Sequence, residues 1–143
     1  YVSIFPLALR LLEATDERLG FLIDNIRDEN LGLWSKYGLR SLSKNDNLFG
    51  KEENYWRGKI WININFLTLK ALHKYSMMKG PYQTKAKLVY DELRTNVINN
   101  IYQQYRKGGF IYENYNSEII NGTLFPWWVL SDLPSSSLYS FTI

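Results

Sequence analysis

Cysteine is absent from this chain of 143 residues, and His73 is its single histidine. The lack of cysteine excludes a disulfide framework and a thiol nucleophile within the sequence. With no cysteine and one histidine, the sequence offers no metal cluster and no histidine-based triad. His73 lies beside Lys74 on a predicted helix and is interpreted as an ordinary surface or half-buried residue. A glycine-rich phosphate loop is also missing. We therefore expect neither a metal ion nor a cofactor.

Long apolar runs are missing as well. The longest apolar stretch, Val2 to Leu12, is interrupted by Pro6 and Arg10 and is shorter than the roughly 20 residues that a membrane-spanning helix needs. The chain begins at Tyr1 and continues directly into apolar residues with helical spacing and no preceding cap. We interpret it as a segment of a longer protein, so any contact with a membrane would be made through a region absent from this chain.

Charge of one sign is not concentrated anywhere in the sequence. The 17 Lys and Arg residues exceed the 14 Asp and Glu residues by three, and the two signs are scattered among each other. A surface that follows a phosphate backbone requires a denser track of Lys and Arg. Nucleic acid is therefore not an expected partner.

Helical periodicity dominates what is present. Apolar spacing predicts helices over residues 4–13 and 16–27, joined as a hairpin by a turn near Ala14 and Thr15. A third helix is predicted from Ile60 to beyond Tyr75. A fourth restarts after Pro81 and ends at Gly108 and Gly109. Strand-like alternation is nearly absent, so the predicted class is all-α, built from antiparallel helical pairs.

Two long loops interrupt this helical pattern. Residues 28–54 are rich in Gly, Ser, Asn, Asp and Lys, and the second loop follows Gly109. Large apolar residues recur through the first loop, which indicates an ordered segment, because long loops in compact domains are either functional or disordered. These residues are Trp34, Tyr37, Leu39, Leu42 and Phe49. We expect a functional site at the loops and helix ends.

The stretch "EENYWRGKIWININF", residues 52–66, combines flat aromatic rings with polar side chains. A pyranose ring has an apolar face that stacks on Trp or Tyr and a rim of hydroxyl groups that needs hydrogen-bonding partners. The cluster of Tyr55, Trp56, Arg57 and Trp61 supplies both, which predicts carbohydrate binding. Rings that only fill a core are the alternative explanation.

Two carboxylates are candidates for acid–base chemistry. Glu113 stands in "GFIYENYN", where the rings of Tyr112 and Tyr115 could shield its carboxyl group from water, and Glu53 has a similar aromatic setting beside "NYWRG". A shielded carboxylate can act as a general base. Most other carboxylates lie on predicted helix faces or caps and are interpreted as solvated.

Several long motifs together resemble one known family. They are "YGLRSLS" at 37–43, "ENYWRGKIWININFLTLKALHKY" at 53–75, "GPYQTKAKLVYDELRTNVINNIYQQY" at 80–105 and "GFIYENYN" at 109–116. In this order and spacing they resemble glycoside hydrolase family 63, the mannosyl-oligosaccharide glucosidases. The resemblance extends to about Phe125.

This resemblance implies an inverting α-glucosidase that removes the terminal α-1,2-linked glucose from the triglucosylated N-glycan precursor on nascent glycoproteins. The family's catalytic domain is an (α/α)6 toroid of helical hairpins in the lumen of the endoplasmic reticulum, carried by a membrane-anchored protein. Residues 1–125 would be the C-terminal portion of that toroid. Residues 126–143 form a divergent or truncated tail, in which Trp127 replaces a glycine and Pro134 interrupts any helix.

The resemblance also implies roles for individual residues. Glu113 corresponds to the general base. Tyr55, Trp56 and Trp61 correspond to rings that stack on substrate. Arg57 would order the loop or bind hydroxyls, and Trp128 falls near the family's last site tryptophan. Glu53 and Tyr115 are possible supports of the site. The general acid is an aspartate upstream of this chain, so the chain alone is expected to be inactive.

Two alternatives to an enzyme stay open at the level of sequence. The chain could be a non-catalytic oligosaccharide-binding module that lacks the acid, or a helical scaffold whose aromatic rings are core. Full burial of Trp56 and Trp61 would favour the scaffold. The enzyme hypothesis predicts that Glu113, Tyr55, Trp56 and Trp61 line one concave surface, and Glu113 on the opposite side from "YWRG" would contradict it.

Overall fold

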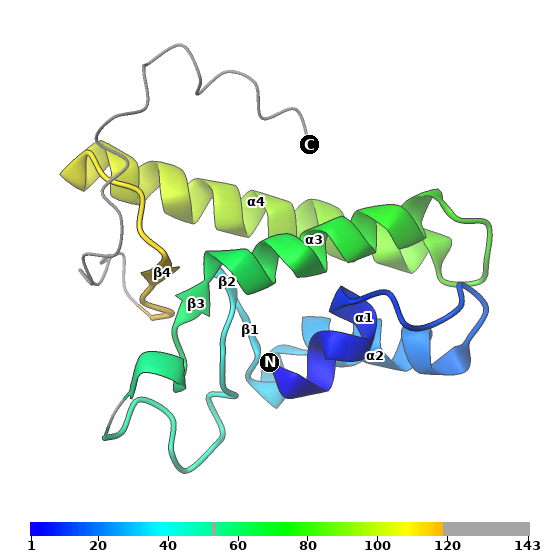
Figure 1. Cartoon of the computed structure of the whole chain (residues 1–143), viewed down its shortest axis with the longest axis horizontal. Helices are drawn as coiled ribbons and strands as arrows, with labels where there is room; N and C mark the ends of the chain where they lie inside the picture. The colour runs from blue at the N-terminus through cyan, green and yellow to red at the C-terminus, as the bar shows by residue number, and fades with distance from the viewer. Residues whose placement is uncertain (53, 119–143) are drawn as a thin grey trace.

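The computed structural model describes residues 1–52 and 54–118, whose arrangement is shown in Figure 1. Helices make up most of the described structure, in agreement with the predicted all-α class. The helices are α1 (Phe5–Ala8), α2 (Glu17–Arg27), α3 (Ile62–Met77) and α4 (Gln83–Gly108). The strands have two residues each and are β1 (Trp34–Ser35), β2 (Gly38–Leu39), β3 (Ile60–Trp61) and β4 (Asn114–Tyr115). Short 3-10 turns cover Val2–Ile4, Glu29–Leu31 and Asn54–Trp56.

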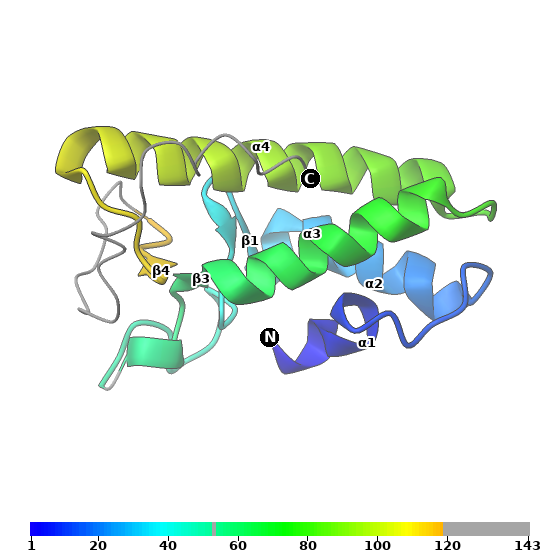
Figure 2. The same cartoon turned by 45° about the horizontal axis from the view of Figure 1, so that its top comes forward.

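The α3–α4 hairpin is the central element of the fold. The two helices lie side by side in both views of the molecule (Figures 1 and 2) and run antiparallel. Both were predicted, because each presents an apolar face at helical spacing. Gly109 ends α4 in a left-handed conformation, with φ of 73°, and its N–H donates to the Tyr105 carbonyl oxygen at 2.7 Å. The predicted glycine stop is therefore confirmed.

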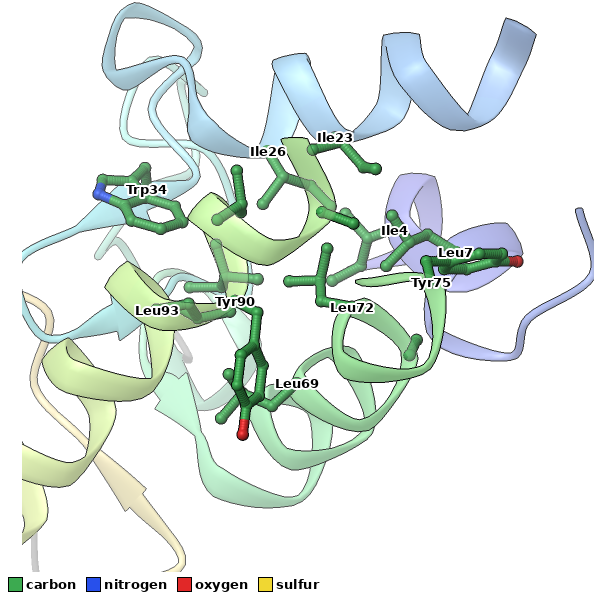
Figure 3. Packing of buried hydrophobic residues seen from close by; sticks show 14 of the residues in the cluster. Ile4, Leu7, Ile23, Ile26, Trp34, Leu69, Leu72, Tyr75, Tyr90 and Leu93 are labelled. Carbon is green, nitrogen blue, oxygen red and sulfur yellow. The ribbon is translucent and has the colours of Figure 1, made fainter. Parts of the chain in front are cut away.

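Helix α2 packs on α4 and completes the main core. It begins after Asp16, whose side chain accepts a hydrogen bond from the Arg18 N–H at 2.9 Å and so caps the helix. Observed and predicted limits agree within one residue. Figure 3 shows how side chains from the four helices and from β1 meet in this core. Its members include Ile4, Leu7, Ile23, Ile26, Trp34, Leu69, Leu72, Tyr75, Tyr90 and Leu93.

The prediction for the first helix is wrong in its extent. Instead of residues 4–13, the α-helix covers only Phe5–Ala8. Arg10 adopts a left-handed conformation with φ of 57°, which ends the helix, and Leu9 and Leu11 are 52% and 70% exposed. The predicted hairpin with α2 is also wrong, because α1 packs mainly on α3 while α2 packs on α4.

Two short antiparallel strand pairs organise the long loops. Trp34 pairs with Leu39 in β1–β2, and Ile60 pairs with Tyr115 in β3–β4. In the loop 28–54, the side chains of Trp34, Tyr37 and Leu39 are buried, as expected for an ordered segment. Within the described ranges, no helix combines the length and apolarity that crossing a bilayer requires.

Asn65, at the start of α3, connects both strand pairs. Its side chain is completely buried. The Oδ1 atom accepts the Leu39 N–H at 2.8 Å, and Nδ2 donates to the carbonyl oxygens of Leu39 and Trp61 at 3.1 and 2.8 Å. Gly38 permits this close approach, because a Cβ atom there would lie 3.0 Å from Asn65 Oδ1, and its φ is 135°. One amide therefore fixes β2 against the end of β3.

Replacing Asn65 should loosen β2 locally. We expect Asn65→Ala to speed amide exchange at Leu39 by about 10- to 100-fold, because a buried N–H that loses its acceptor destabilises the structure by about 1–3 kcal/mol. Hydrogen exchange followed by mass spectrometry of the peptide covering residues 37–41 measures this. Asn99→Ala, at an exposed position of α4, is the matched control. Equal exchange in both variants would contradict the role of Asn65.

Candidate functional site

Backbone pairing brings the two candidate loops together. Trp61 of β3 pairs with Asn114 of β4, and the Ile62 N–H donates to the Glu113 carbonyl oxygen at 3.1 Å. Glu113 thus lies directly beside the segment that carries "YWRG", on the same side of the molecule. The arrangement that would have contradicted the enzyme hypothesis is not found.

The carboxyl group of Glu113 contacts Tyr55 rather than the neighbouring tyrosines. Tyr55 donates its hydroxyl hydrogen to Glu113 Oε2 at 3.2 Å. Desolvation, followed by the charge of Glu113 and this hydrogen bond, raises the pKa of Tyr55 above its ordinary value. The hydroxyl therefore stays protonated and able to donate at neutral pH.

The expectation that Tyr112 and Tyr115 shield Glu113 is wrong. The two rings pack edge to face, with centroids 5.8 Å apart, and Tyr115 is completely buried in a small second core with Tyr37 and Ile60. Its hydroxyl accepts the Tyr112 N–H at 3.0 Å. Both rings serve this core, and Glu113 itself is exposed. Tyr115 supports the loop from beneath.

The aromatic residues form one connected cluster in two layers. Trp56 stacks on Trp61 with centroids 3.7 Å apart and an interplanar angle of 6°. Tyr55 stands edge-on to Trp61, with centroids 4.6 Å apart, and Tyr1 stands edge-on to Trp56 at 6.4 Å. Trp61 is 2% exposed, whereas Trp56 is 50% exposed. In the described structure, Trp56 is the indole that offers surface to a ligand, and Trp61 lies beneath it.

Tyr1 anchors this cluster to the fold. Its hydroxyl donates to the Leu39 carbonyl oxygen at 2.9 Å and accepts from the Trp61 N–H at 3.0 Å and from Asn65 Nδ2 at 3.4 Å. Burial raises the pKa of the Tyr1 hydroxyl. Sequence reasoning missed both Tyr1 and Asn65. An asparagine within the apolar start of a predicted helix was a usable signal for Asn65, but Tyr1 carried none.

Arg57 holds the loop that precedes Tyr55 and Trp56. Its Nη1 atom donates to Glu52 Oε2 at 2.7 Å and to the Lys51 carbonyl oxygen at 3.2 Å. Its own carbonyl oxygen accepts the Gly50 N–H at 2.8 Å. These contacts support one of the two roles predicted for Arg57, which is to order the loop. Glu53 and Trp128 lie outside the described residues.

Two cavities border the aromatic cluster. One of about 600 Å³ lies beside Trp56 and is also lined by Tyr1, Ser41 and Ile64. A smaller one of about 220 Å³ is lined by Asn54, Arg57, Lys59 and Asn116, among others. Glu113 lines neither of them, so a single concave surface shared by Glu113 and the rings stays a prediction. In the described ranges, no group of three His, Asp or Glu side chains could hold a metal ion.

Comparison with known protein families decides the class of the chain. The family model described as the glycosyl hydrolase family 63 C-terminal domain matches residues 1–125. The chain belongs to glycosyl hydrolase family 63. The resemblance carried by the "YWRG" and "GFIYENYN" motifs is thereby confirmed.

Similar proteins occur in yeasts and plants. A probable mannosyl-oligosaccharide glucosidase of Schizosaccharomyces pombe is 51% identical over 117 residues, which cover 81% of this chain and 14% of that protein. Mannosyl-oligosaccharide glucosidase of Saccharomyces cerevisiae is 40% identical over 127 residues, and mannosyl-oligosaccharide glucosidase GCS1 of Arabidopsis thaliana is 39% identical over 128 residues. Each of these two alignments covers 86% of this chain and 15% of the relative. This chain thus spans about one seventh of the length of each of these three relatives.

The stacked indoles should have a spectroscopic signature. Two stacked rings in contact couple their transitions, and a twist between their transition dipoles within the stack gives an exciton couplet in the circular dichroism spectrum, which we expect Trp56→Phe and Trp61→Phe each to remove. Trp34→Phe changes a buried indole of the main core and should retain the couplet. A couplet that survives Trp61→Phe would contradict the stack.

Burial of the Tyr1 hydroxyl predicts a loss of stability at high pH. The folded state binds the phenolic proton more tightly than the unfolded chain does, whose tyrosines have a pKa of about 10. The stability that the protonated Tyr1 hydroxyl contributes is therefore complete below about pH 10, and it is lost as the pH rises further toward the folded-state pKa. Urea midpoints measured between about pH 9 and pH 11 should fall less steeply for Tyr1→Phe than for the unsubstituted protein. Parallel declines would contradict this prediction.

Proposed function

We propose that this chain forms part of the active site of an inverting α-glucosidase, which removes the terminal α-1,2-linked glucose from the triglucosylated N-glycan precursor on nascent glycoproteins. The observation that carries the proposal is the contact between Glu113 and Tyr55, next to the half-exposed ring of Trp56. A carboxylate bonded to a tyrosine whose ring contacts an accessible indole matches what a glycoside hydrolase needs at a pyranose. The names of the similar proteins support the same substrate.

In the proposed reaction, Glu113 is the general base. It takes a proton from water as the water oxygen bonds to C1 of the glucose, while the bond from C1 to the glycosidic oxygen breaks and that oxygen takes a proton from a carboxylic acid. The acid is an aspartate of an upstream segment, at about 6.5–9.5 Å from Glu113, the separation that leaves room for the water in inverting enzymes. This chain alone would therefore be inactive.

In this proposal the remaining residues bind the substrate or shape the site. Trp56 stacks on a sugar ring, Trp61 backs it from the buried side, and Arg57 holds the loop. Trp128 remains a proposed site residue on the strength of the family resemblance, and Glu53 remains a possible support on the strength of its aromatic setting in the sequence. A scaffold function is disfavoured because Trp56 is 50% exposed rather than core.

The proposed architecture is the C-terminal portion of an (α/α)6 toroid, formed by residues 1–125, with residues 126–143 as a divergent tail. The α3–α4 hairpin supports it, because both loops of the candidate site gather at one end of that hairpin (Figure 1). The proposed location is the lumen of the endoplasmic reticulum, where N-glycan precursors are trimmed. Any membrane anchor would belong to another region of the protein.

Glu113→Gln in the full-length protein tests the proposal. We expect turnover of a fluorescent triglucosylated oligosaccharide to fall by at least about 100-fold with binding retained, because a positioned general base contributes that much or more. Glu17→Gln, at an exposed position of α2 that lines neither cavity of the candidate site, is the matched control and should keep full turnover. If Glu113→Gln hydrolyses the oligosaccharide at the unsubstituted rate, the base is another residue and an oligosaccharide-binding module becomes the better proposal.

A further inference from the structure

We propose that Tyr55 is a positioning residue for Glu113, acting through its hydroxyl group on the carboxylate rather than through its ring on the sugar. This inference rests on the proposed function, in which Glu113 is the general base. Sequence reasoning had assigned Tyr55 to stacking on substrate, because it considered the ring alone. The structure places the hydroxyl against Glu113 Oε2 instead, at 3.2 Å.

Glu113 needs such a partner because, within the part of the chain that the structure describes, its other hydrogen bonds hold the backbone. The β3–β4 pairing and the Ile62 N–H hold the main chain of Glu113, but an exposed glutamate side chain can still rotate about several bonds. One hydrogen bond to Oε2 selects an orientation. Oε1 is not engaged by this bond, and it is the oxygen that would accept the proton of the attacking water. An oriented base accepts a proton faster than a mobile one, because the rate of proton transfer depends on geometry.

Tyr55 is itself held firmly enough to act as a positioning group. Its ring stands at 87° to both Trp61 and Trp56, with centroids 4.6 and 6.0 Å away. The Trp61 Nε1–H donates to the Tyr55 carbonyl oxygen at 3.2 Å, which fixes the 3-10 turn Asn54–Trp56 from below. Trp61 is buried and directly precedes the first residue of α3, so the position of the Tyr55 hydroxyl is set by the core of the fold.

Tyr55→Phe tests this role, because it keeps the ring and removes only the hydroxyl. In the full-length protein we expect kcat for the triglucosylated oligosaccharide to fall by about 10- to 100-fold, which is the effect of losing one hydrogen bond to a charged group. KM should stay within about threefold, because the ring can still contact substrate. Tyr102→Phe, at an exposed tyrosine of α4, is the matched control and should leave kcat unchanged.

A double-mutant cycle separates positioning from any other role. If Tyr55 acts through Glu113, Tyr55→Phe should change the residual rate of Glu113→Gln by no more than about twofold. The inference is overturned if Tyr55→Phe retains full kcat, if its effect falls on KM alone, or if the same loss appears in the Glu113→Gln background. An active Glu113→Gln enzyme would instead overturn the proposed function. Loss of turnover in Glu113→Gln with a fully active Tyr55→Phe would overturn only the positioning role.

Discussion

A buried amide group must find its hydrogen-bond partners within the protein, and Asn65 finds them on the two segments that flank the start of α3. Its Oδ1 and Nδ2 atoms bond both backbone groups of Leu39, in the way that a neighbouring strand would. Its second Nδ2 bond reaches the carbonyl oxygen of Trp61. The long loop 28–54 and the aromatic segment are thereby fixed to the same helix end, and the candidate site depends on that connection.

The site is built in layers above this connection. Asn65 and Trp61 are inaccessible or nearly so, and the Tyr1 hydroxyl group bonds to both of them. Trp56, Tyr55 and Glu113 lie further out and are held from beneath by these groups. Such an arrangement separates the residues that specify geometry from those that would meet a sugar. Preorganisation of this kind places a reacting group without ordering it anew at each turnover.

The sequence predicted the regular elements more fully than the site. Helices α2, α3 and α4 were found because apolar spacing predicts all three and the Gly109 stop marks the end of α4. The first helix was overextended, because Leu9 and Leu11 continue the apolar rhythm although Arg10 turns the chain away. Glu113 and the "YWRG" segment were linked through the family resemblance. Neither periodicity nor composition could reveal that Tyr55 bonds Glu113, since that contact depends on tertiary pairing between distant segments.

The unequal lengths of the two central helices determine where Glu113 returns to the fold. At about 1.5 Å per residue, the 16 residues of α3 and the 26 residues of α4 extend about 24 and 39 Å. Helix α4 therefore runs past the start of α3, and residues 109–113 lead the chain back to β3. Each residue of a helix turns the following chain by about 100°. The number of residues in α4 thus constrains the position of the candidate base. The last turns of this helix act as a spacer as well as a part of the core.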